Sequence, residues 1–385
     1  MNVVNTEVAI LGAGLIGGSA ALALARAGVA CVVIERGAAG AAASGVNFGG
    51  VRRQGRSPAQ LHLAARAHEI WPRLRALIGT DGEYVRSGHL KLARTDRDLQ
   101  ALAAYRERVA GFGLDLEIVE GADFRRRYPC FGKEVIGGSL CPDDGQANPR
   151  LVAPAFTRAA QQAGAMLLDH CHIVGLDREG DAFVLTSADG RQIRSHLLIN
   201  AAGAWGAQAA AALGDDFPLR IKHPTMAVTE PLPPVVSVSV GIEGGGFYAR
   251  QVARGNVVMG GGFGESVGED ICRPGAAAMA SLGANASAIL PALAQASIIR
   301  YWSGIEGYFD DKNPVLGASS TQPGLIHAFG FSGAGFQISP AVGEVLADMV
   351  RGRDTLDCAD VFSPARFAQP NTPHPQSITP LKGSA

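Results

Sequence analysis

The sequence predicts an α/β fold with two domains, and three segments predict it. Residues 8–35 read as a buried strand, a glycine-rich turn, a helix and a second strand, the order found at the ligand-binding edge of a Rossmann-like sheet. Residues 327–349 read as another glycine-rich turn that leads into another helix. Residues 219–263 contain several strand-like runs separated by prolines and glycines. We therefore predict a Rossmann-like domain and a second α+β domain built on a mainly antiparallel sheet.

The first glycine-rich turn has the pattern G-x-G-x-x-G at Gly12, Gly14 and Gly17. The first glycine allows a tight turn, the second lets the backbone approach a pyrophosphate, and the third lets the helix pack close to the strand. The free N–H groups and the positive dipole end of the helix favour phosphate. Glu35 ends the second strand, 18 residues after Gly17, where its carboxylate can accept hydrogen bonds from ribose hydroxyls. These residues predict a dinucleotide site.

Length and composition limit the other possibilities. A chain of 385 residues exceeds one average core, so two domains are expected. A net charge of −1 without a basic block argues against nucleic acid as a partner. The six cysteines form no C-x-x-C pair, which favours reduced thiols over a disulfide frame or a metal site. We find no pattern of a secretory signal or a membrane span, and expect a cytoplasmic protein without a metal.

Four more segments follow the fingerprint in order: ASGVNFGGVRRQ, DDGQANP, LLINAAGAW, and RYWSGIEGY with NPVLG and GFSGAGFQISP. With the fingerprint and Glu35, they resemble the FAD-dependent amino-acid and amine oxidoreductases of the D-amino-acid oxidase family over nearly the whole chain. The branch includes glycine oxidase, sarcosine oxidase β subunits, D-hydroxyproline dehydrogenases and opine oxidases. The resemblance implies an FAD-binding domain of the glutathione-reductase type.

The resemblance also implies which residues surround the cofactor. Residues 44–50 would wrap the ribityl chain and the flavin ring, Ile173 would face the adenine, residues 201–205 would pass near the pyrophosphate and the flavin, and residues 330–337 would run along the ring. No cysteine lies in residues 302–313, where some relatives attach flavin, so we expect noncovalent FAD. The predicted cofactor-binding residues are Gly12, Gly14, Leu15, Ile16, Gly17, Glu35, Arg36, Ser44, Gly45, Asn47, Phe48, Gly49, Gly50, Ile173, Ala201, Ala202, Gly203, Trp205, Gly330, Ser332, Gly333, Ala334, Gly335, Phe336 and Gln337.

The predicted domains are discontinuous along the chain. We expect the FAD-binding domain to comprise residues 1–83, 140–215 and 312–364, and the substrate-binding domain residues 84–139 and 216–311. Residues 365–385 are proline-rich and lack a core pattern, so that this tail needs another surface, such as a second subunit, to become ordered.

The second glycine-rich turn predicts where the last helix begins. Ser339 is a plausible N-cap and Pro340 a plausible first-turn proline. The positive end of a helix that starts there would stabilise negative charge on the N1–C2=O side of reduced flavin.

Several residues are candidates for substrate binding. Tyr248 lies where glycine-oxidase-like members place an active-site tyrosine, and Arg250 follows two residues later on the same strand face. Arg52 or Arg53 could bind a carboxylate as a bidentate fork. Lys222 and His223 are similar candidates. For each of these residues an ordinary core or surface role remains open.

Two departures from the family pattern bear on the substrate. Glutamate stands at position 306, where glycine- and D-amino-acid-oxidase-like members have a carboxylate-binding arginine, and Gly333 replaces a further arginine of glycine oxidase. Glu306 with Tyr308 looks more like the W-x-G-x-E-G-Y pattern of opine- and hydroxyproline-oxidising relatives. The hypothesis is that Glu306 attracts a cationic amine or guanidinium, and the alternative is a structural acid.

The predicted function follows from the resemblance. It is oxidation of the C–N bond of an amino acid or secondary amine, of the opine, D-hydroxyproline or sarcosine type, by hydride transfer to flavin N5 and hydrolysis of the imine. Residues 257–259 carry no lysine of the kind that helps oxygen react in some relatives, which favours a dehydrogenase. Several such relatives are catalytic subunits of complexes, so the resemblance also implies a hetero-oligomer. The electron acceptor would be a partner flavin or iron–sulfur subunit, a quinone or O₂. A non-catalytic FAD-binding scaffold, an oxygen-using primary amino-acid oxidase and an NAD(P)-linked dehydrogenase remain alternatives.

Overall fold

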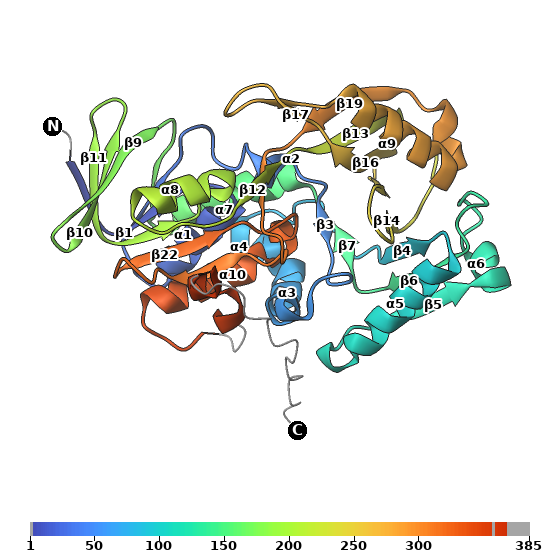
Figure 1. Ribbon diagram of the computed structural model, residues 1–385, viewed down its shortest axis with the longest axis horizontal. Helices are drawn as coiled ribbons and strands as arrows, with labels where there is room; N and C mark the ends of the chain where they lie inside the picture. Colours follow the sequence, from blue (N-terminus) through green and yellow to red (C-terminus); the bar gives the residue numbers. More distant parts are fainter. Residues whose placement is uncertain (1–2, 356–358, 368–385) are drawn as a thin grey trace.

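The computed structural model describes residues 3–355 and 359–367. These residues form two large β-sheets, which lie on the left and right of Figure 1 with helices around them. The small antiparallel pair β3 (Gly50–Val51) and β7 (Gly145–Gln146) lies between the two sheets. In this part of the chain, no helix combines the length and the apolar character that crossing a membrane requires.

The first sheet has a parallel centre. Its strands β8, β2, β1, β11 and β22 are parallel neighbours, and β21 is an antiparallel edge strand. All four residues of β2 are buried, as expected for an apolar strand covered on both faces. The hairpin of β9 and β10 extends the sheet from the first half of β11. The bounds are β1 (Val3–Leu11), β2 (Cys31–Ile34), β8 (Met166–Leu168), β9 (Ile173–Glu179), β10 (Ala182–Ser187), β11 (Gln192–Asn200), β21 (Val315–Ala318) and β22 (Leu325–Phe329).

Three helices pack together against this sheet: α1 (Leu15–Arg26), α7 (Pro149–Gln162) and α10 (Gly335–Val350). Their small residues allow very close approach, since a Cβ at Gly18 would lie 2.8 Å from the Thr157 hydroxyl and one at Gly343 would lie 2.5 Å from the Ser19 backbone. The other helices are α2 (Ala43–Val46), α3 (Leu61–Ile70), α4 (Leu74–Ile78), α5 (Asp96–Arg108), α6 (Gly121–Arg127), α8 (Gly206–Ala212) and α9 (Ala276–Ile289).

The second sheet is antiparallel except where β14 meets β4, and α9 contributes to its apolar core. The two sheets confirm the predicted fold class, whereas the exact domain limits stay a prediction. In spatial order the strands are β19 (Ile298–Ser303), β13 (Pro224–Pro231), β16 (Asn256–Phe263), β15 (Tyr248–Gln251), β14 (Ser239–Ile242), β4 (His89–Ala93), β6 (Gly137–Cys141) and β5 (Glu117–Glu120). The short pairs are β12 (Arg220–Lys222) with β20 (Glu306–Tyr308), and β17 (Glu265–Ser266) with β18 (Cys272–Arg273).

The predicted start of the last helix is wrong. The helix α10 begins at Gly335, so Ser339 and Pro340 lie inside it rather than at its cap. Pro340 has no N–H to donate to the carbonyl of Phe336 four residues earlier. The Ser339 hydroxyl donates to that carbonyl instead, at 3.0 Å, which explains why the proline is tolerated there.

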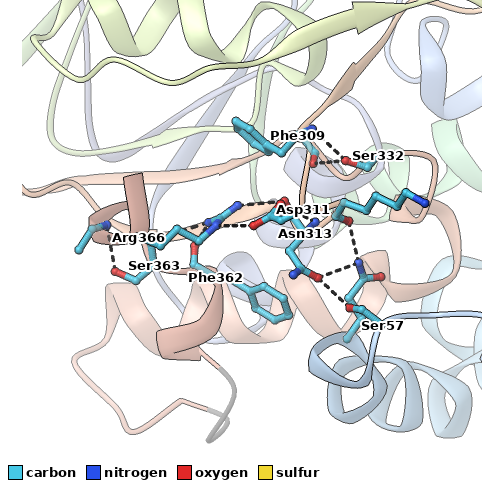
Figure 2. A network of polar contacts seen from close by, with 12 residues as sticks. Ser57, Phe309, Asp311, Asn313, Ser332, Phe362, Ser363 and Arg366 are labelled. Carbon is cyan, nitrogen blue, oxygen red and sulfur yellow. Dashed lines mark hydrogen bonds and ion pairs between the residues drawn. The ribbon is translucent and has the colours of Figure 1, made fainter. Parts of the chain in front are cut away.

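The last described segment is fastened to the loop that follows β20. Arg366 pairs with Asp311 at 3.0 Å and donates to the carbonyl of Asn313 at 3.0 Å, and its side chain is only 3% exposed. Figure 2 shows this network, in which the Ser57 hydroxyl holds the Asn313 side chain at 2.8 Å from the other side. Of the predicted tail, only residues 365–367 lie within the described residues, and the rest lies outside them.

The substitution Arg366→Met tests this fastening. The variant removes the guanidinium donors from Asp311 Oδ2 and from the Asn313 carbonyl, so we expect the free energy of unfolding to fall by about 2 kcal/mol. The measurement is urea denaturation of the cofactor-loaded protein, with Arg353→Met, at an exposed arginine, as the control. Equal unfolding midpoints for the two variants would contradict the expectation.

Candidate functional site

A cavity of about 1350 Å³ extends from the carboxyl ends of β1 and β2 to the second sheet. Ligands of open α/β sheets bind at such strand ends. Pockets for small ligands usually measure ~300–1000 Å³, so this cavity has room for a large cofactor together with a substrate.

The fingerprint glycines shape one end of the cavity. Gly12 has a φ of +103°, and a Cβ there would lie 2.6 Å from the Ala201 carbonyl oxygen. A Cβ at Gly17 would lie 1.9 Å from the Gly12 carbonyl oxygen, so only glycine permits α1 to pack this close to the turn. The Ser44 hydroxyl accepts the Leu15 N–H at 2.8 Å and fixes the next segment against the start of α1. This end is a backbone cradle of the kind that holds a pyrophosphate.

Glu35 and Arg36 follow the cradle at the end of β2. The carboxylate of Glu35 accepts the N–H groups of Ala13 and Gly37, both at 2.9 Å, which fixes its orientation. The guanidinium of Arg36 lies 3.7 Å from the centre of the Trp205 ring and pairs with Asp270 at 2.8 Å. Arg36 therefore connects two loops that line the cavity, one of them next to the second sheet.

The segment 46–49 is held from the second sheet. Arg250 donates from Nε to the Phe48 carbonyl at 2.6 Å, and the Trp302 indole donates to the Val46 carbonyl at 2.7 Å. The Asn47 side chain accepts the Gly49 N–H at 2.8 Å. These bonds fix the backbone of a segment that lines the cavity.

Arg250 was predicted to bind substrate, but the structure places it beneath this segment. It is buried and does not line the cavity, and burial lowers its pKa to about 10. Arg53 is also outside the lining, where its backbone N–H binds Asp144 and its guanidinium lies 3.5 Å from Asp143. His223 does not line the cavity either, whereas the next residue, Pro224, does. None of these three residues therefore contacts a ligand in the cavity directly.

Most predicted cofactor residues line the cavity. Gly17, Gly45 and Gln337 do not: the two glycines provide close packing behind the wall, and the Gln337 side chain donates to the Ala64 carbonyl inside the helix layer at 2.8 Å. The residues that line it are Gly12, Gly14, Leu15, Ile16, Glu35, Arg36, Ser44, Asn47, Phe48, Gly49, Gly50, Ile173, Ala201, Ala202, Gly203, Trp205, Gly330, Ser332, Gly333, Ala334, Gly335 and Phe336.

Tyr248 on the second sheet and Glu306 and Tyr308 on the separate β12–β20 pair line the cavity. The Tyr308 hydroxyl donates to Glu306 Oε2 at 2.8 Å. Burial raises the pKa of the Glu306 carboxyl, and the hydrogen bond from Tyr308 opposes this rise. A Cβ at Gly333 would lie 3.3 Å from the Tyr308 hydroxyl, so the missing side chain leaves space directly beside this pair.

Tyr248 lies near two charged side chains of the cavity lining, Glu306 and Arg52. Its ring contacts the Phe48 ring edge-on, with 4.7 Å between the centroids, and covers Gly260, where a Cβ would clash with the ring at 2.3 Å. Burial and the charge of Glu306 raise the pKa of Tyr248, and the charge of Arg52 lowers it. The phenol is therefore a neutral hydrogen-bonding group near both charges.

Arg52 also lines the cavity and is half-buried. Its Nη1 donates to the Gln54 carbonyl at 2.6 Å, and within the described residues it forms no ion pair with a carboxylate. Lys222 is opposite Glu306 in the β12–β20 pair, but its ammonium lies 5.0 Å from the centre of the Tyr308 ring and outside the lining. Of the predicted substrate residues, the structure brings together Tyr248, Arg52 and Glu306.

Sequence reasoning missed Lys91, Tyr105, Arg108 and Glu243, which also line the cavity. Lys91 lies two residues after His89 on β4, so the two side chains share one face of the strand. Nothing in the pattern showed that this face looks into the cavity, because the loop that carries Glu243 comes from a distant part of the chain.

Known proteins provide an independent comparison. A model of the family described as FAD dependent oxidoreductase matches residues 7–349. Glycine oxidase of Geobacillus kaustophilus is 27% identical, over 94% of this chain and 97% of the relative. A subunit of opine oxidase from Rhizobium meliloti is 25% identical, over the same shares of the two chains. Among solved structures, glycine oxidase from G. kaustophilus has a TM-score of 0.88, at 25% identity, covering 94% of this chain and 99% of that one. L-proline dehydrogenase from P. horikoshii has a TM-score of 0.87, at 26% identity, covering 95% and 98%.

The substitution Gly17→Ala tests the cradle. A methyl group 1.9 Å from the Gly12 carbonyl must push α1 away from the turn, so we expect the purified variant to lose most of its bound flavin. The measurement is the ratio of flavin to protein absorbance. Gly283→Ala is the control, since a Cβ at this position of α9 meets no atom within 4 Å. Full flavin content in Gly17→Ala would refute the close-packing role.

The described residues fit the cofactor that the comparisons imply. The glycine cradle suits a pyrophosphate, the fixed segment 46–49 and the segment 330–336 both contribute to the lining of the cavity, and its volume exceeds that of an ordinary substrate pocket. The resemblance stated from the sequence is thereby confirmed: the chain belongs to the FAD-dependent oxidoreductase family and binds FAD.

Proposed function

We propose that the protein oxidises the C–N bond of an amino acid, with a secondary amine as the favoured class. Bound FAD supplies the acceptor at flavin N5 for the hydride that leaves the carbon next to nitrogen, after which water hydrolyses the imine to an amine and a carbonyl compound. The side chains of the protein must then bind the zwitterionic substrate beside the flavin.

The observation that carries the proposal is the pair of opposite charges, Arg52 and Glu306, in the lining of the cavity. Arg52 has guanidinium donors that no carboxylate of the described residues occupies, and these donors suit a substrate carboxylate. Glu306 presents a carboxyl group for the cationic amine, and the Tyr248 hydroxyl lies close enough to both charges for its pKa to respond to them. A carboxyl whose pKa is raised is also suited to take the proton of the ammonium before hydride transfer.

We further propose that FAD is bound noncovalently and that the enzyme is a dehydrogenase, acting as the catalytic subunit of a complex. The strand β16 contains no lysine, and its residues Val257 and Met259 are buried in the apolar core of the second sheet. The opine oxidase relative from R. meliloti is by name one subunit of an enzyme, which supports the assignment to a complex.

Anaerobic mixing of the purified protein with a panel of amines tests the proposed function. The panel holds octopine, nopaline, D-hydroxyproline, sarcosine, glycine and D-alanine. We expect rapid bleaching of the oxidised flavin band with a secondary amino acid, and slow reoxidation when air is readmitted. Bleaching only by glycine or D-alanine with fast reoxidation would favour a primary amino-acid oxidase, and no bleaching by any member would favour the scaffold alternative.

The substitution Glu306→Gln tests the cation site. In the wild type, affinity for a cationic amino acid should rise as the pH rises through the raised pKa of Glu306, because the carboxyl then becomes charged. The variant should lose this pH dependence and bind at least about ten-fold more weakly at neutral pH. The measurement is perturbation of the flavin spectrum by ligand as a function of pH. Glu134→Gln, at an exposed acid of the second domain, is the control.

The same variant separates this role from a structural one. Since the pKa of Glu306 in the folded protein lies above its usual 4.5, the carboxyl favours folding while it is protonated, and this contribution is lost as the pH rises through the raised value. Glu306→Gln should therefore be at least as stable as the wild type at neutral pH. A variant that unfolds more easily and keeps its ligand affinity would establish a structural acid.

A further inference from the structure

We propose that the cavity continues past Arg52 into an arm that binds a second anionic group, so that the substrate is an amino acid whose nitrogen substituent carries another carboxylate. This inference rests on the proposed function. The outer arm is lined by Gly55, Lys91, Ala104, Tyr105, Arg108 and Glu243.

The outer arm begins at Arg52. A Cβ at Gly55 would lie 3.3 Å from Arg52 Nη1 and 3.5 Å from Lys91 Nζ, so the two cations flank the same exposed glycine. The charge of Arg52 also lowers the pKa of Tyr248, which lines the same cavity. A ligand held by Arg52 and Tyr248 thus has the outer arm next to it.

Helix α5 forms the far wall. The Tyr105 hydroxyl donates to the Arg56 carbonyl at 3.1 Å, which fastens the helix to the segment that carries Arg52. The Arg108 guanidinium lies 5.4 Å from the centre of the Tyr105 ring, one turn further along the helix. Ala104 is small and exposed, so the arm opens to solvent between this helix and the loop that carries Glu243.

The charges along this path do not balance. Lys91 pairs with Glu243 at 2.5 Å, whereas Arg52 and Arg108 form no ion pair within the described residues. Two other carboxylates of the cavity lining already have partners, since Asp270 pairs with Arg36 and Asp311 with Arg366. Since Glu306 offsets Arg52 and Glu243 offsets Lys91, Arg108 is the cation of the outer arm that has no carboxylate partner within the described residues.

This arrangement separates two anionic groups of one ligand. Arg52 suits the carboxylate next to the reacting carbon, and Glu306 suits the amine. A substituent on the nitrogen can then reach along the outer arm, where Arg108 and the Lys91 ammonium offer donors to a second carboxylate. Both donors are partly solvated, so each should contribute only a few-fold in affinity.

The test compares sarcosine, iminodiacetate and N-(3-carboxypropyl)glycine with the cofactor-loaded enzyme. Iminodiacetate is sarcosine with a carboxylate added to the methyl group, and the third compound carries that carboxylate on a longer arm. Anaerobic stopped-flow measurement of flavin reduction gives a dissociation constant and a limiting rate for each. We expect the two dicarboxylic compounds to bind more tightly than sarcosine in the wild type.

Three variants locate the effect. Arg108→Gln should reduce the preference for the dicarboxylic compounds over sarcosine by about five-fold, and Glu243→Gln should increase it, because a negative charge leaves the outer arm. Arg97→Gln is the matched control, since Arg97 lies on the same helix, is exposed and does not line the cavity.

The outcomes separate this inference from the proposed function. If none of the three compounds nor any member of the amine panel reduces the flavin, the proposed function fails. If sarcosine reduces it but the wild type has no preference for a second carboxylate, the outer arm has no such role. Equal losses for all three compounds in Arg108→Gln, which vanish at high salt, would show general attraction of anions and would also overturn the inference.

Discussion

The close packing of helix α1 on the turn after β1 is the constraint on which the site depends. The Gly12 carbonyl occupies the space where any other residue at position 17 would place its Cβ, 1.9 Å away. This contact fixes the start of α1, and the start of α1 fixes Ser44 through the Leu15 N–H. From Ser44 the chain runs into the segment 46–49 and then to Arg52, so that the positions of the substrate-binding groups follow from the cradle. A shift of the helix would therefore be transmitted along the wall of the cavity.

The β12–β20 pair adds to the wall of the cavity a carboxyl group that is expensive to bury. Glu306 is held by one hydrogen bond from Tyr308 and by no cation within the described residues, and burial raises its pKa. Such a carboxyl lowers the stability of the ionised protein. The glycines at positions 260 and 333 also give up side-chain packing at the site. Each leaves space for a neighbouring tyrosine, Tyr248 beside Gly260 and Tyr308 beside Gly333. The buried charge therefore lies where a bound ligand can compensate it.

The sequence predicted the local features well and the long-range ones poorly. The fingerprint, Glu35 and the fold class could be predicted because each rests on neighbouring residues and on a repeated backbone pattern. The start of α10 was mispredicted because Ser339 and Pro340 form a cap pattern, whereas the hydroxyl in fact replaces a backbone donor inside the helix. Arg250 and Arg52 looked equivalent as isolated cations. Only the fold shows that the first supports the Phe48 backbone and that the second has donors facing the cavity. The outer arm could not be predicted, because it joins α5, β4 and the loop after β14.

The bonds from Arg250 and Trp302 to the segment 46–49 have a consequence for how the protein matures. The segment lies in the first eighth of the chain, but the two side chains that hold its backbone come about 200 residues later or more. During synthesis the cradle can form early from local contacts, while this part of the cavity wall must wait until β15 and β19 have been made and have paired. Completion of the cavity is therefore a late event in biogenesis, and an amino-terminal fragment that contains the complete fingerprint lacks the side chains that hold the segment 46–49.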